Sequence, residues 1–528
     1  MLPRPAHAKA RPIASLETLQ DDAAYRALQT HDARFDGRLF VGVTSTRIYC
    51  RPVCRVRPPK RENCRFFANA ALAEQGGFRP CLRCRPELAP GLSLMDSSHA
   101  LASRAALLLG QAAQDGLDPT LPSLAAKLGV TDRHLRRLFN QVHGVSPLAY
   151  LSTQRLLLAK QLLTDTALPV TEVALATGYA SLRRFNAAFV QRYRMSPSAL
   201  RKARPDVGSK HADATTATTT PAATTQAPVL RLAWRPPYDL DAVLGFFSRR
   251  AVPGVEWVDG LVLRRTLALQ QRGQRHTGWL AARFVPERCE VALTVSPSLL
   301  PALGQLLGRT RQALDLDAEP ALIDPVLLDP VLAGANAKTT GIARPGIRLP
   351  GGFDGFEIAT RVILGQQVTV AAARTLTLRL VDRFGEPIDT PFADLTRLFP
   401  SAETLASATA ESIGMLGIVR QRVGALQALA LAVADGRIQL HRAAPLQATL
   451  DALRALPGIG DWSAQLIAMR ALAWPDAWPA TDIGVLNALR AHTGGVRDAV
   501  AAAAHAERWR PWRAYAVMKL WLTLETPP

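Results

Sequence analysis

The sequence predicts a multidomain protein that is mainly α-helical, with two smaller α+β parts. The chain has 528 residues, which is more than one core of ordinary size accommodates. A Thr- and Ala-rich stretch between Pro205 and Pro228 lacks large apolar residues, so it cannot offset the entropy of ordering, and we expect a disordered linker. Apolar residues recur at helical spacing in residues 99–202 and from Phe353 onward, whereas residues 35–85 and 230–320 carry short strand-like runs.

These changes of pattern divide the chain into four expected domains and one linker. The expected order is an α+β domain in 1–92, an all-α domain in 93–204, the linker in 205–228, an α+β subdomain in 229–345 and an all-α domain in 346–528. Within the α+β subdomain we expect strands at Leu261–Leu269 and Val291–Val295 and a helix near Leu299–Leu314.

The charge balance indicates a polyanionic partner. Lys and Arg number 63 against 43 Asp and Glu, a net charge of +20, which favours nucleic acid. No run approaches the roughly 18 apolar residues of a membrane helix, so we expect no membrane association and a monomer in the cytoplasm of a bacterium, near the nucleoid. The basic segment Met1–Pro12 resembles a transit peptide in charge, but its prolines favour a disordered tail.

Four of the six cysteines form two close pairs. The spacing is C-x3-C and then C-x2-C, with 26 residues between the pairs, at Cys50 and Cys54 and at Cys81 and Cys84. Such pairs are typical of a tetrahedral site for one Zn²⁺ with four cysteine ligands. A zinc ion that only stabilises the domain is one interpretation; basic neighbours such as Arg47 and Arg51 favour another, in which DNA phosphate approaches the thiolates. We expect Cys64 and Cys289 to be packed residues, not ligands.

The segment around these cysteines resembles the metal-binding domain of the Ada family over residues 19–90. The motifs F-D-G-R, Y-C-R-P-x-C, R-E-N and G-F-R-P-C-x-R-C-R-P-E stand in order. The resemblance implies that Cys50 accepts the methyl group of a DNA methylphosphotriester. That triester has lost its charge, so a zinc-bound thiolate can approach it without repulsion. Methylation changes the site from −2 to −1, and we therefore expect methylated Cys50 to raise DNA affinity.

Two segments, residues 121–142 and Val170–Tyr193, each predict a helix, a glycine turn and a second helix. Thr131 and Ser181 stand where the second helices should begin. One such segment is imitated by any helical hairpin, but the tandem pair resembles the AraC family domain over 99–202, which places one helix of each motif in the major groove. The candidate DNA contacts are Arg133, Arg136, Arg137, Arg183 and Arg184.

Downstream of the linker, no Pro-Cys-His-Arg motif of an Ada-type second methyltransferase occurs. Instead, residues 456–460 read L-P-G-I-G between two expected helices, and Asp482 follows 22 residues after Gly460. Gly458 and Gly460 would let backbone N–H groups approach a phosphate, although such a turn and a helix-capping aspartate also occur without function. Together with ILGQQVTVAAAR and ERWRPWRAYAVMKLWL, these residues resemble the helix-hairpin-helix glycosylases of the AlkA type (3-methyladenine DNA glycosylase II) over 229–528.

This second resemblance assigns roles to individual residues. It implies that Asp482 is the catalytic carboxylate, that Trp462 and Trp521 line the base pocket, and that Gln367 fills the gap left in the duplex. Leu466 stands where relatives can carry an aromatic residue. Trp462 stands where lyase-type relatives carry a lysine, which favours simple hydrolysis. An alkylated purine is already cationic and leaves readily, so one carboxylate near the oxocarbenium-like sugar suffices.

The sequence thus predicts a bifunctional DNA-alkylation response protein. It would accept a phosphotriester methyl group on Cys50, regulate transcription when methylated and excise alkylated purines such as 3-methyladenine. The expected partners are double-stranded DNA, both damaged and promoter, and RNA polymerase is a further candidate. Two alternatives remain open: a repair glycosylase that uses its N-terminal domains only to hold DNA, and a pure transcription regulator with decayed repair domains.

Overall fold

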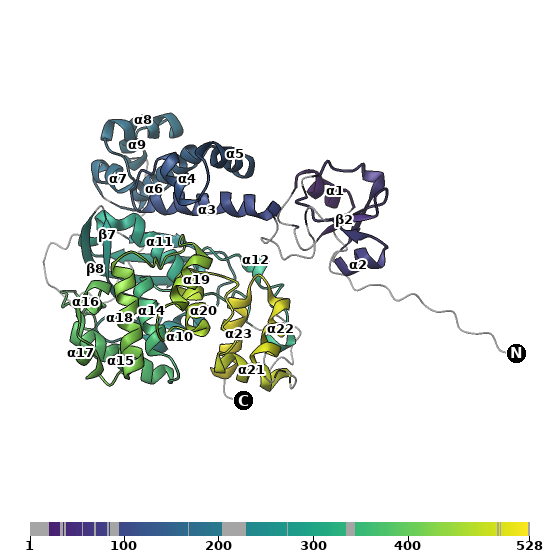
Figure 1. Cartoon of the computed structure of the whole chain (residues 1–528). Helices are drawn as coiled ribbons and strands as arrows, with labels where there is room; N and C mark the ends of the chain where they lie inside the picture. The colour runs from purple at the N-terminus through teal and green to yellow at the C-terminus, as the bar shows by residue number, and fades with distance from the viewer. Residues whose placement is uncertain are drawn as a thin grey trace. The chain divides into compact units, whose positions relative to one another are not determined.

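The computed structural model describes residues 21–31, 35, 39–54, 56–67, 70–81, 84, 94–166, 168–202, 229–271, 273–333, 344–493, 496 and 498–525. The chain forms two compact units, one of residues 1–106 and 120–150 and the other of residues 107–119 and 151–528 (Figure 1). The expected linker 205–228 and the tail Met1–Pro12 lie outside the described residues. The expected fold class is confirmed, because helices predominate and two sheets are present in the described ranges. None of these helices combines the length and apolar character needed to cross a bilayer.

The first unit contains a four-stranded sheet in the order β3-β1-β2-β4. Its strands are β1 Phe40–Val43, β2 Ile48–Cys50, β3 Cys64–Phe67 and β4 Arg79–Pro80. Side chains alternate between the faces of a strand, so Val41 packs with residues of α1 (Asp21–Gln29) and Phe40 with Ala73 of α2 (Ala70–Gln75). Cys64 belongs to the α1 core and is 6% exposed, as expected for a packed residue.

The first helix-turn-helix motif completes this unit. Its helices are α4 Leu121–Lys127 and α5 Asp132–His143, which pack on each other. The expected cap is confirmed, since the Thr131 hydroxyl oxygen accepts a hydrogen bond from the backbone N–H of His134. Gly129 in the turn has φ +67°, a conformation that costs glycine little.

The second helix-turn-helix motif lies in the second unit. Its elements are α7 Val170–Ala176, α8 Leu182–Tyr193 and α9 Pro197–Lys202, preceded by α6 Pro147–Asp165, which like α3 (Leu94–Gln114) contributes residues to both units. Ser181 caps α8 as expected, because its hydroxyl oxygen accepts from the N–H of Arg184.

The residues from Val229 onward begin with an antiparallel sheet in the order β5-β9-β8-β7-β6. Its strands are β5 Val229–Ala233, β6 Glu256–Asp259, β7 Val262–Gln271, β8 Gln274–Val285 and β9 Glu290–Val295, and the accompanying helices are α10 Leu240–Arg250, α11 Leu303–Ala313, α12 Pro320–Ile323 and α13 Pro330–Ala333, with 3₁₀ turns η3 Pro286–Arg288 and η4 Pro297–Ala302. The helix expected near Leu299–Leu314 is therefore two elements. Pro301 cannot donate a backbone hydrogen bond, which fits a 3₁₀ turn before α11.

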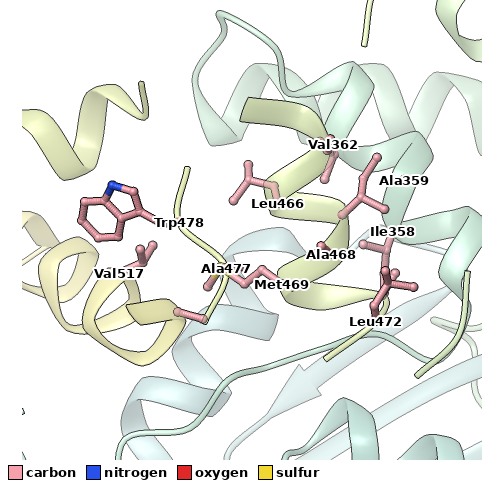
Figure 2. Close-up of a cluster of buried hydrophobic side chains, with 14 of the residues drawn as sticks. Ile358, Ala359, Val362, Leu466, Ala468, Met469, Leu472, Ala477, Trp478 and Val517 are labelled. Carbon is pink, nitrogen blue, oxygen red and sulfur yellow. The ribbon is translucent and has the colours of Figure 1, made fainter. Parts of the chain in front are cut away.

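The C-terminal part of this unit is helical, as expected. Its elements are α14 Gly355–Leu364, α15 Val370–Phe384, α16 Ala402–Ser407, α17 Ala410–Gly414, α18 Arg420–Ala434, α19 Leu446–Arg454, α20 Asp461–Arg470, α21 Ile483–Thr493, α22 Ala499–Ala506, the 3₁₀ turn η5 Glu507–Trp509 and α23 Arg513–Glu525. Figure 2 shows α14 and α20 in contact through Val362, Ala359 and Leu466. This buried apolar contact holds α14 and α20 together, and both helices border the groove described below.

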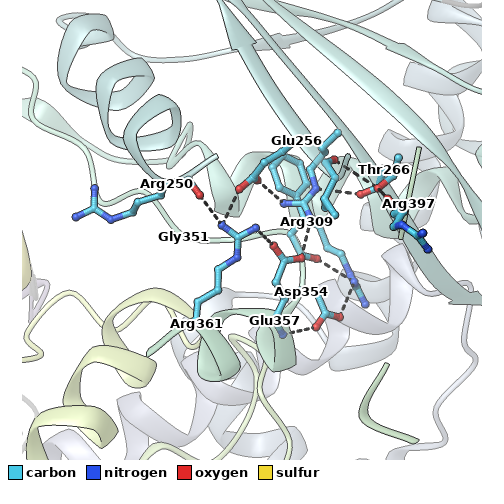
Figure 3. Close-up of polar contacts among 12 residues, drawn as sticks. Arg250, Glu256, Thr266, Arg309, Gly351, Asp354, Glu357, Arg361 and Arg397 are labelled. Atoms are coloured by element: carbon cyan, nitrogen blue, oxygen red, sulfur yellow. Dashed lines mark hydrogen bonds and ion pairs between the residues drawn. The ribbon is translucent and has the colours of Figure 1, made fainter. Parts of the chain in front are cut away.

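Four buried charges join the antiparallel sheet to the helical part. Arg265 of β7 forms ion pairs with Glu256 at 3.4 Å and Glu357 at 2.7 Å, and Arg361 pairs with the same two carboxylates at 2.6 and 2.7 Å (Figure 3). The two arginines hold the pKa of Glu357 below its usual range against the opposing effect of burial. Because the charges balance, this quartet fixes α14 against the sheet without leaving an uncompensated ion.

Candidate functional sites

Strand pairing brings the four cysteines of the first unit together. Strand β2 ends at Cys50 and runs parallel to β4, whose last residue directly precedes Cys81. The Cys81 N–H donates to the carbonyl of Tyr49 at 3.0 Å. After Cys50 the chain makes a turn, closed by a 3.0 Å hydrogen bond from the Cys54 N–H to the carbonyl of Arg51, which brings Cys54 back beside Cys50. Both pairs therefore meet at one edge of the sheet.

The geometry of this cluster suits one zinc ion. All four Sγ atoms lie within 4.8 Å of one another and all four residues are buried. Thiolates about 2.3 Å from a tetrahedral Zn²⁺ stand roughly 3.8 Å apart, so the ion fits with small adjustments. Hydrogen bonds among the thiols lower the pKa of Cys54 and raise the pKa of Cys50, so the sulfurs are coupled and do not hold their protons equally. Zinc bound here holds thiolates deprotonated at neutral pH.

The two arginines expected beside the cluster have different environments. Arg47 is exposed. Arg51 is only 1% exposed; its backbone N–H donates to Cys84 Sγ at 3.4 Å and its guanidinium donates to the Cys84 carbonyl at 3.5 Å. The side chain of Arg51 is therefore enclosed beside the cysteine cluster, whereas that of Arg47 is open to solvent. Sequence spacing could not reveal this, because both residues stand in the same basic stretch.

Each helix-turn-helix motif presents arginines on an exposed face. In α5 the buried side chains are Leu135, Leu138 and Phe139, and in α8 they are Phe185 and Phe189. All five candidate arginines are exposed: Arg133, Arg136 and Arg137 in α5 and Arg183 and Arg184 in α8. The expected candidates are thus accessible in both motifs.

A groove of about 1230 Å³ crosses the helical part of the second unit. Its lining includes the expected residues Trp462, Leu466, Asp482, Trp521 and Gln367. Leu466 is 7% exposed and also packs into the core, so its aliphatic side chain forms part of a wall. The structure therefore gathers residues 154 positions apart in the sequence into one concave site.

Asp482 lies in this groove and is held by three N–H donors. The indole N–H of Trp462 donates to its Oδ2 at 2.9 Å, and the indole N–H of Trp521 donates to its Oδ1 at 3.0 Å. Oδ1 also accepts from the backbone N–H of Val485 at 2.9 Å, so Asp482 caps α21 as well. The sequence did not predict that both tryptophans point their indole nitrogens at this carboxylate.

The glycine-rich hairpin lies between α19 and α20, as expected. Gly458 has φ +76°, and its carbonyl accepts from the Gln366 amide at 2.9 Å; the same amide also donates to the Ser463 hydroxyl at 2.9 Å. Gly460 is the first residue before α20, and a Cβ there would meet nothing within 4 Å. The open N-terminus of α20 therefore remains accessible from solvent.

Gln367 stands at the tip of the turn between α14 and α15. It is exposed and has φ +54°, which is uncommon for a residue with a side chain. Arg422 donates to the carbonyl of the neighbouring Gln366. Gln366 joins this turn to the hairpin, and Arg422 joins it to α18. Sequence reasoning missed both residues, and the adjacent pair of glutamines was the only signal.

The far wall of the groove is basic. The guanidinium groups of Arg250 and Arg470 form cation–π contacts with the ring of Phe246, and their Cζ atoms lie 3.9 and 4.7 Å from its centroid. Burial, followed by repulsion from Arg250, lowers the pKa of Arg470 to about 9. Arg470 is anchored by the carbonyls of Pro350 and Gly351. This end of the groove is suited to negatively charged or electron-rich groups.

Models of four protein families match the chain in order. The metal binding domain of Ada matches residues 23–87, a helix-turn-helix domain 124–203, the AlkA N-terminal domain 229–354, and the HhH-GPD superfamily of base excision DNA repair proteins 360–514. The four cysteines lie within the first match and Asp482 within the last.

Three bacterial relatives cover the chain to different extents. The "Probable bifunctional transcriptional activator/DNA repair enzyme AlkA" of Mycobacterium tuberculosis is 38% identical, covering 96% of this chain and 97% of its own length. DNA-3-methyladenine glycosylase 2 of Escherichia coli is 33% identical over 55% of this chain and 96% of its own length. The Ada protein of Escherichia coli is 38% identical over 25% of this chain and 35% of its own length. The chain therefore belongs to the AlkA-type bifunctional family, in which an Ada zinc domain, an AraC-type helix-turn-helix region and a helix-hairpin-helix base excision domain follow one another.

Proposed function

We propose that the second unit excises alkylated purines of the 3-methyladenine type by hydrolysis, with Asp482 as the catalytic carboxylate. The observation that carries this proposal is the carboxylate at the wall of the groove, held by the two indole N–H groups. Water adds to C1′ of the sugar as the bond to the base breaks, the cationic base leaves as a neutral molecule with the bonding electron pair, and the water loses one proton to solvent. Asp482 stabilises the positive charge that develops on the sugar and orients the water.

The groove also supports the expected approach to DNA. The exposed turn at Gln367 borders the groove and would enter the gap left by a flipped nucleotide. The Gly458–Gly460 hairpin and the N-terminus of α20 would hold a backbone phosphate. The groove holds no lysine at position 462, so the proposed reaction stops at an intact abasic site.

The test is the release of 3-methyladenine from methylated duplex DNA by the wild-type chain and by Asp482→Asn. Asparagine keeps the shape and can still cap α21, but it carries no charge. We expect base release to fall at least about 100-fold, in line with loss of a charge-stabilising group, while duplex binding stays within about threefold. Equal release by the two proteins would exclude Asp482 as the catalytic group, and no release by wild type would favour a pure regulator.

We further propose that Cys50 accepts a methyl group from a methylphosphotriester. Its thiolate attacks the methyl carbon, the C–O bond breaks, and the phosphate leaves as an ordinary anionic diester, so a thioether forms irreversibly. The burial of the four cysteines and the N–H···S contact at Cys84 support a site in which the sulfurs are not equivalent. A hydrogen bond to sulfur withdraws charge from it, which disfavours Cys84 as the nucleophile.

Peptide mass spectrometry after exposure to methylphosphotriester DNA tests this assignment. One added methyl group mapped to Cys50 is the expected result, and Cys50→Ser should accept none. A methyl group on Cys54 would contradict the proposal.

Because methylation reduces the charge of the zinc site from −2 to −1, we expect methylated protein to bind its own promoter more tightly. Footprinting measures this affinity, and equal affinity before and after methylation would contradict the proposed regulatory role.

A further inference from the structure

The turn that follows α3 lies against the AlkA N-terminal domain within the second unit. The side-chain amide of Gln271, at the end of β7, donates to the backbone carbonyl of Asp115 at 2.9 Å, and the amide of Gln305 in α11 donates to Asp115 Oδ1 at 3.0 Å. The two glutamines are 6% and 9% exposed. Polar side chains are seldom buried this deeply without partners, and here both find their partner in the turn.

The backbones in this region approach so closely that only glycine fits. A Cβ on Gly304 of α11 would lie 2.5 Å from the backbone oxygen of Gln114 and 3.0 Å from Cδ2 of Leu158. On the other side of the contact, Gly116 has φ +61°, and a Cβ there would lie 2.9 Å from the Gln271 amide nitrogen. Cβ atoms in proteins do not approach backbone atoms to 2.5 Å, so this contact requires a glycine at position 304.

An apolar core continues across the same contact. Phe185 and Phe189 of the second helix-turn-helix motif belong to one buried cluster with Leu299 and Leu306 of the AlkA N-terminal domain. Helix α7 contacts η4, and the Gln161 side chain of α6 donates to the carbonyl of Arg231 in β5. The motif is thus attached by apolar, polar and backbone contacts together.

We infer that the second helix-turn-helix motif is docked on the AlkA N-terminal domain, so that the DNA-reading helix α8 and the glycosylase groove belong to one rigid body. The partner of this surface is the turn at residues 114–116 together with α6, α7 and the buried face of α8 of the same chain. The docked motif keeps Arg183 and Arg184 exposed. DNA held by α8 is therefore held at a fixed position relative to the glycosylase. The docking itself depends on neither proposed activity, whereas its consequence for DNA rests on the DNA contacts expected of α8.

The test uses the full chain with a specific protease site inserted between Pro205 and Pro228. After cleavage, size-exclusion chromatography with light scattering should show the two fragments eluting together as a 1:1 complex at micromolar concentration. Separation of the wild-type fragments would overturn the inference. A 2:2 complex would overturn it too, because the surface would then be filled by a second copy.

Two variants, Gly304→Leu and Asp115→Ala, test the contact, and Gly110→Leu is the control. Gly304→Leu should separate the cleaved fragments, whereas Gly110→Leu, on α3 where a Cβ would meet nothing within 4 Å, should not. Asp115→Ala, in the turn itself, should weaken association about tenfold by removing the carboxylate acceptor of Gln305, and it keeps the inference testable should Gly304→Leu fail to fold. If the fragments of Gly304→Leu and of Asp115→Ala associate as tightly as the wild-type fragments, the docking is contradicted.

Discussion

Asp482 combines two roles in one side chain. It caps α21 through Val485, as many aspartates do, and it also receives the indole N–H groups of Trp462 and Trp521. A cap alone has no need of two tryptophan donors, since one backbone N–H satisfies it. The donors fix the orientation of the carboxylate toward the groove, as a catalytic group requires.

The role of these donors can be separated from base stacking. In Trp462→Phe and Trp521→Phe the aromatic face remains but the N–H is lost. Removing a hydrogen bond to a charged group costs about 1.5–3 kcal/mol, so we expect single-turnover base release to slow by about 10- to 150-fold. Trp478→Phe is the matched control, because the indole nitrogen of Trp478 is buried without a hydrogen-bond partner in the described part of the chain. Unchanged rates in both variants would show that the aromatic faces alone matter.

A second residue-scale prediction concerns Asp315, a partly buried carboxyl group that is hydrogen-bonded to Tyr515. Burial raises the pKa of Asp315 to about 6 despite donation by the Leu349 N–H and the Tyr515 hydroxyl, each at 2.9 Å. The folded protein therefore binds this proton more tightly than the unfolded chain, and the corresponding stability is present below about pH 4 and is lost as pH rises toward 6.

Asp315→Asn removes this titration while keeping an acceptor oxygen. Two pK units correspond to roughly 3 kcal/mol, so the variant should be more stable than wild type at pH 7 and show a flatter dependence between pH 4 and 6. Urea unfolding followed by tryptophan fluorescence at several pH values measures this. An identical pH profile for the two proteins would contradict the assignment to Asp315.

The sequence motifs identified Asp482, Trp462 and Trp521 as candidate site residues. They did not show that both indole N–H groups donate to the carboxylate. Which way an indole nitrogen points depends on packing between α20, α21 and α23, and spacing along one chain carries no such information. Arg51 shows the same limit: its basic neighbourhood suggested a surface contact, whereas the fold buries its side chain beside Cys84.

At the scale of elements, helix caps and glycine turns were predictable because their signals are local. Thr131 and Ser181 begin helices where expected, and the L-P-G-I-G segment forms the turn between α19 and α20. The pairing of β2 with β4 was not predictable, since these strands have three and two residues and are too short to show alternation. The cysteine spacing indicated the zinc site without revealing that this pairing builds it.

The hairpin allows a matched test of backbone conformation. Gly458 needs φ +76°, where a Cβ would also lie 3.0 Å from that of Ala425. A left-handed conformation costs a residue with a side chain about 1–2 kcal/mol, so Gly458→Ser should weaken binding to undamaged duplex about tenfold. Gly460→Ser is the control, because φ is −87° there, the space is open and serine is a good N-cap. Equal binding by the two variants would show that the hairpin does not anchor DNA. Fluorescence anisotropy gives both affinities.

At the scale of the whole molecule, the order of domains could be read from composition and motifs, but contacts between them could not. The docking of the second helix-turn-helix motif depends on Gly304, Gln271 and Gln305, which lie in a strand end and a helix with no motif around them. Their spacing matches that of ordinary core and surface positions. Only folding brings them to the turn at Asp115.

Zinc removal should affect one unit and spare the other. The four thiolates lie in the first unit and Asp482 in the second. A structural zinc site contributes folding free energy directly, so chelation should abolish hydrogen-exchange protection in β1–β3 and methyl acceptance together. Base release should stay within about twofold, and restored zinc should restore the protection. Loss of base release on chelation would mean that the two activities depend on one site.

The most direct test of the account is a single incubation with methylated duplex DNA that carries both methylphosphotriesters and alkylated purines. Peptide mass spectrometry then measures the methyl group on the zinc domain, and chromatography measures the released base, for wild type, Cys50→Ser and Asp482→Asn. We predict that Cys50→Ser loses only the methyl group and that Asp482→Asn loses only base release. Full base release by Asp482→Asn, or a methylated zinc domain in Cys50→Ser, would contradict it.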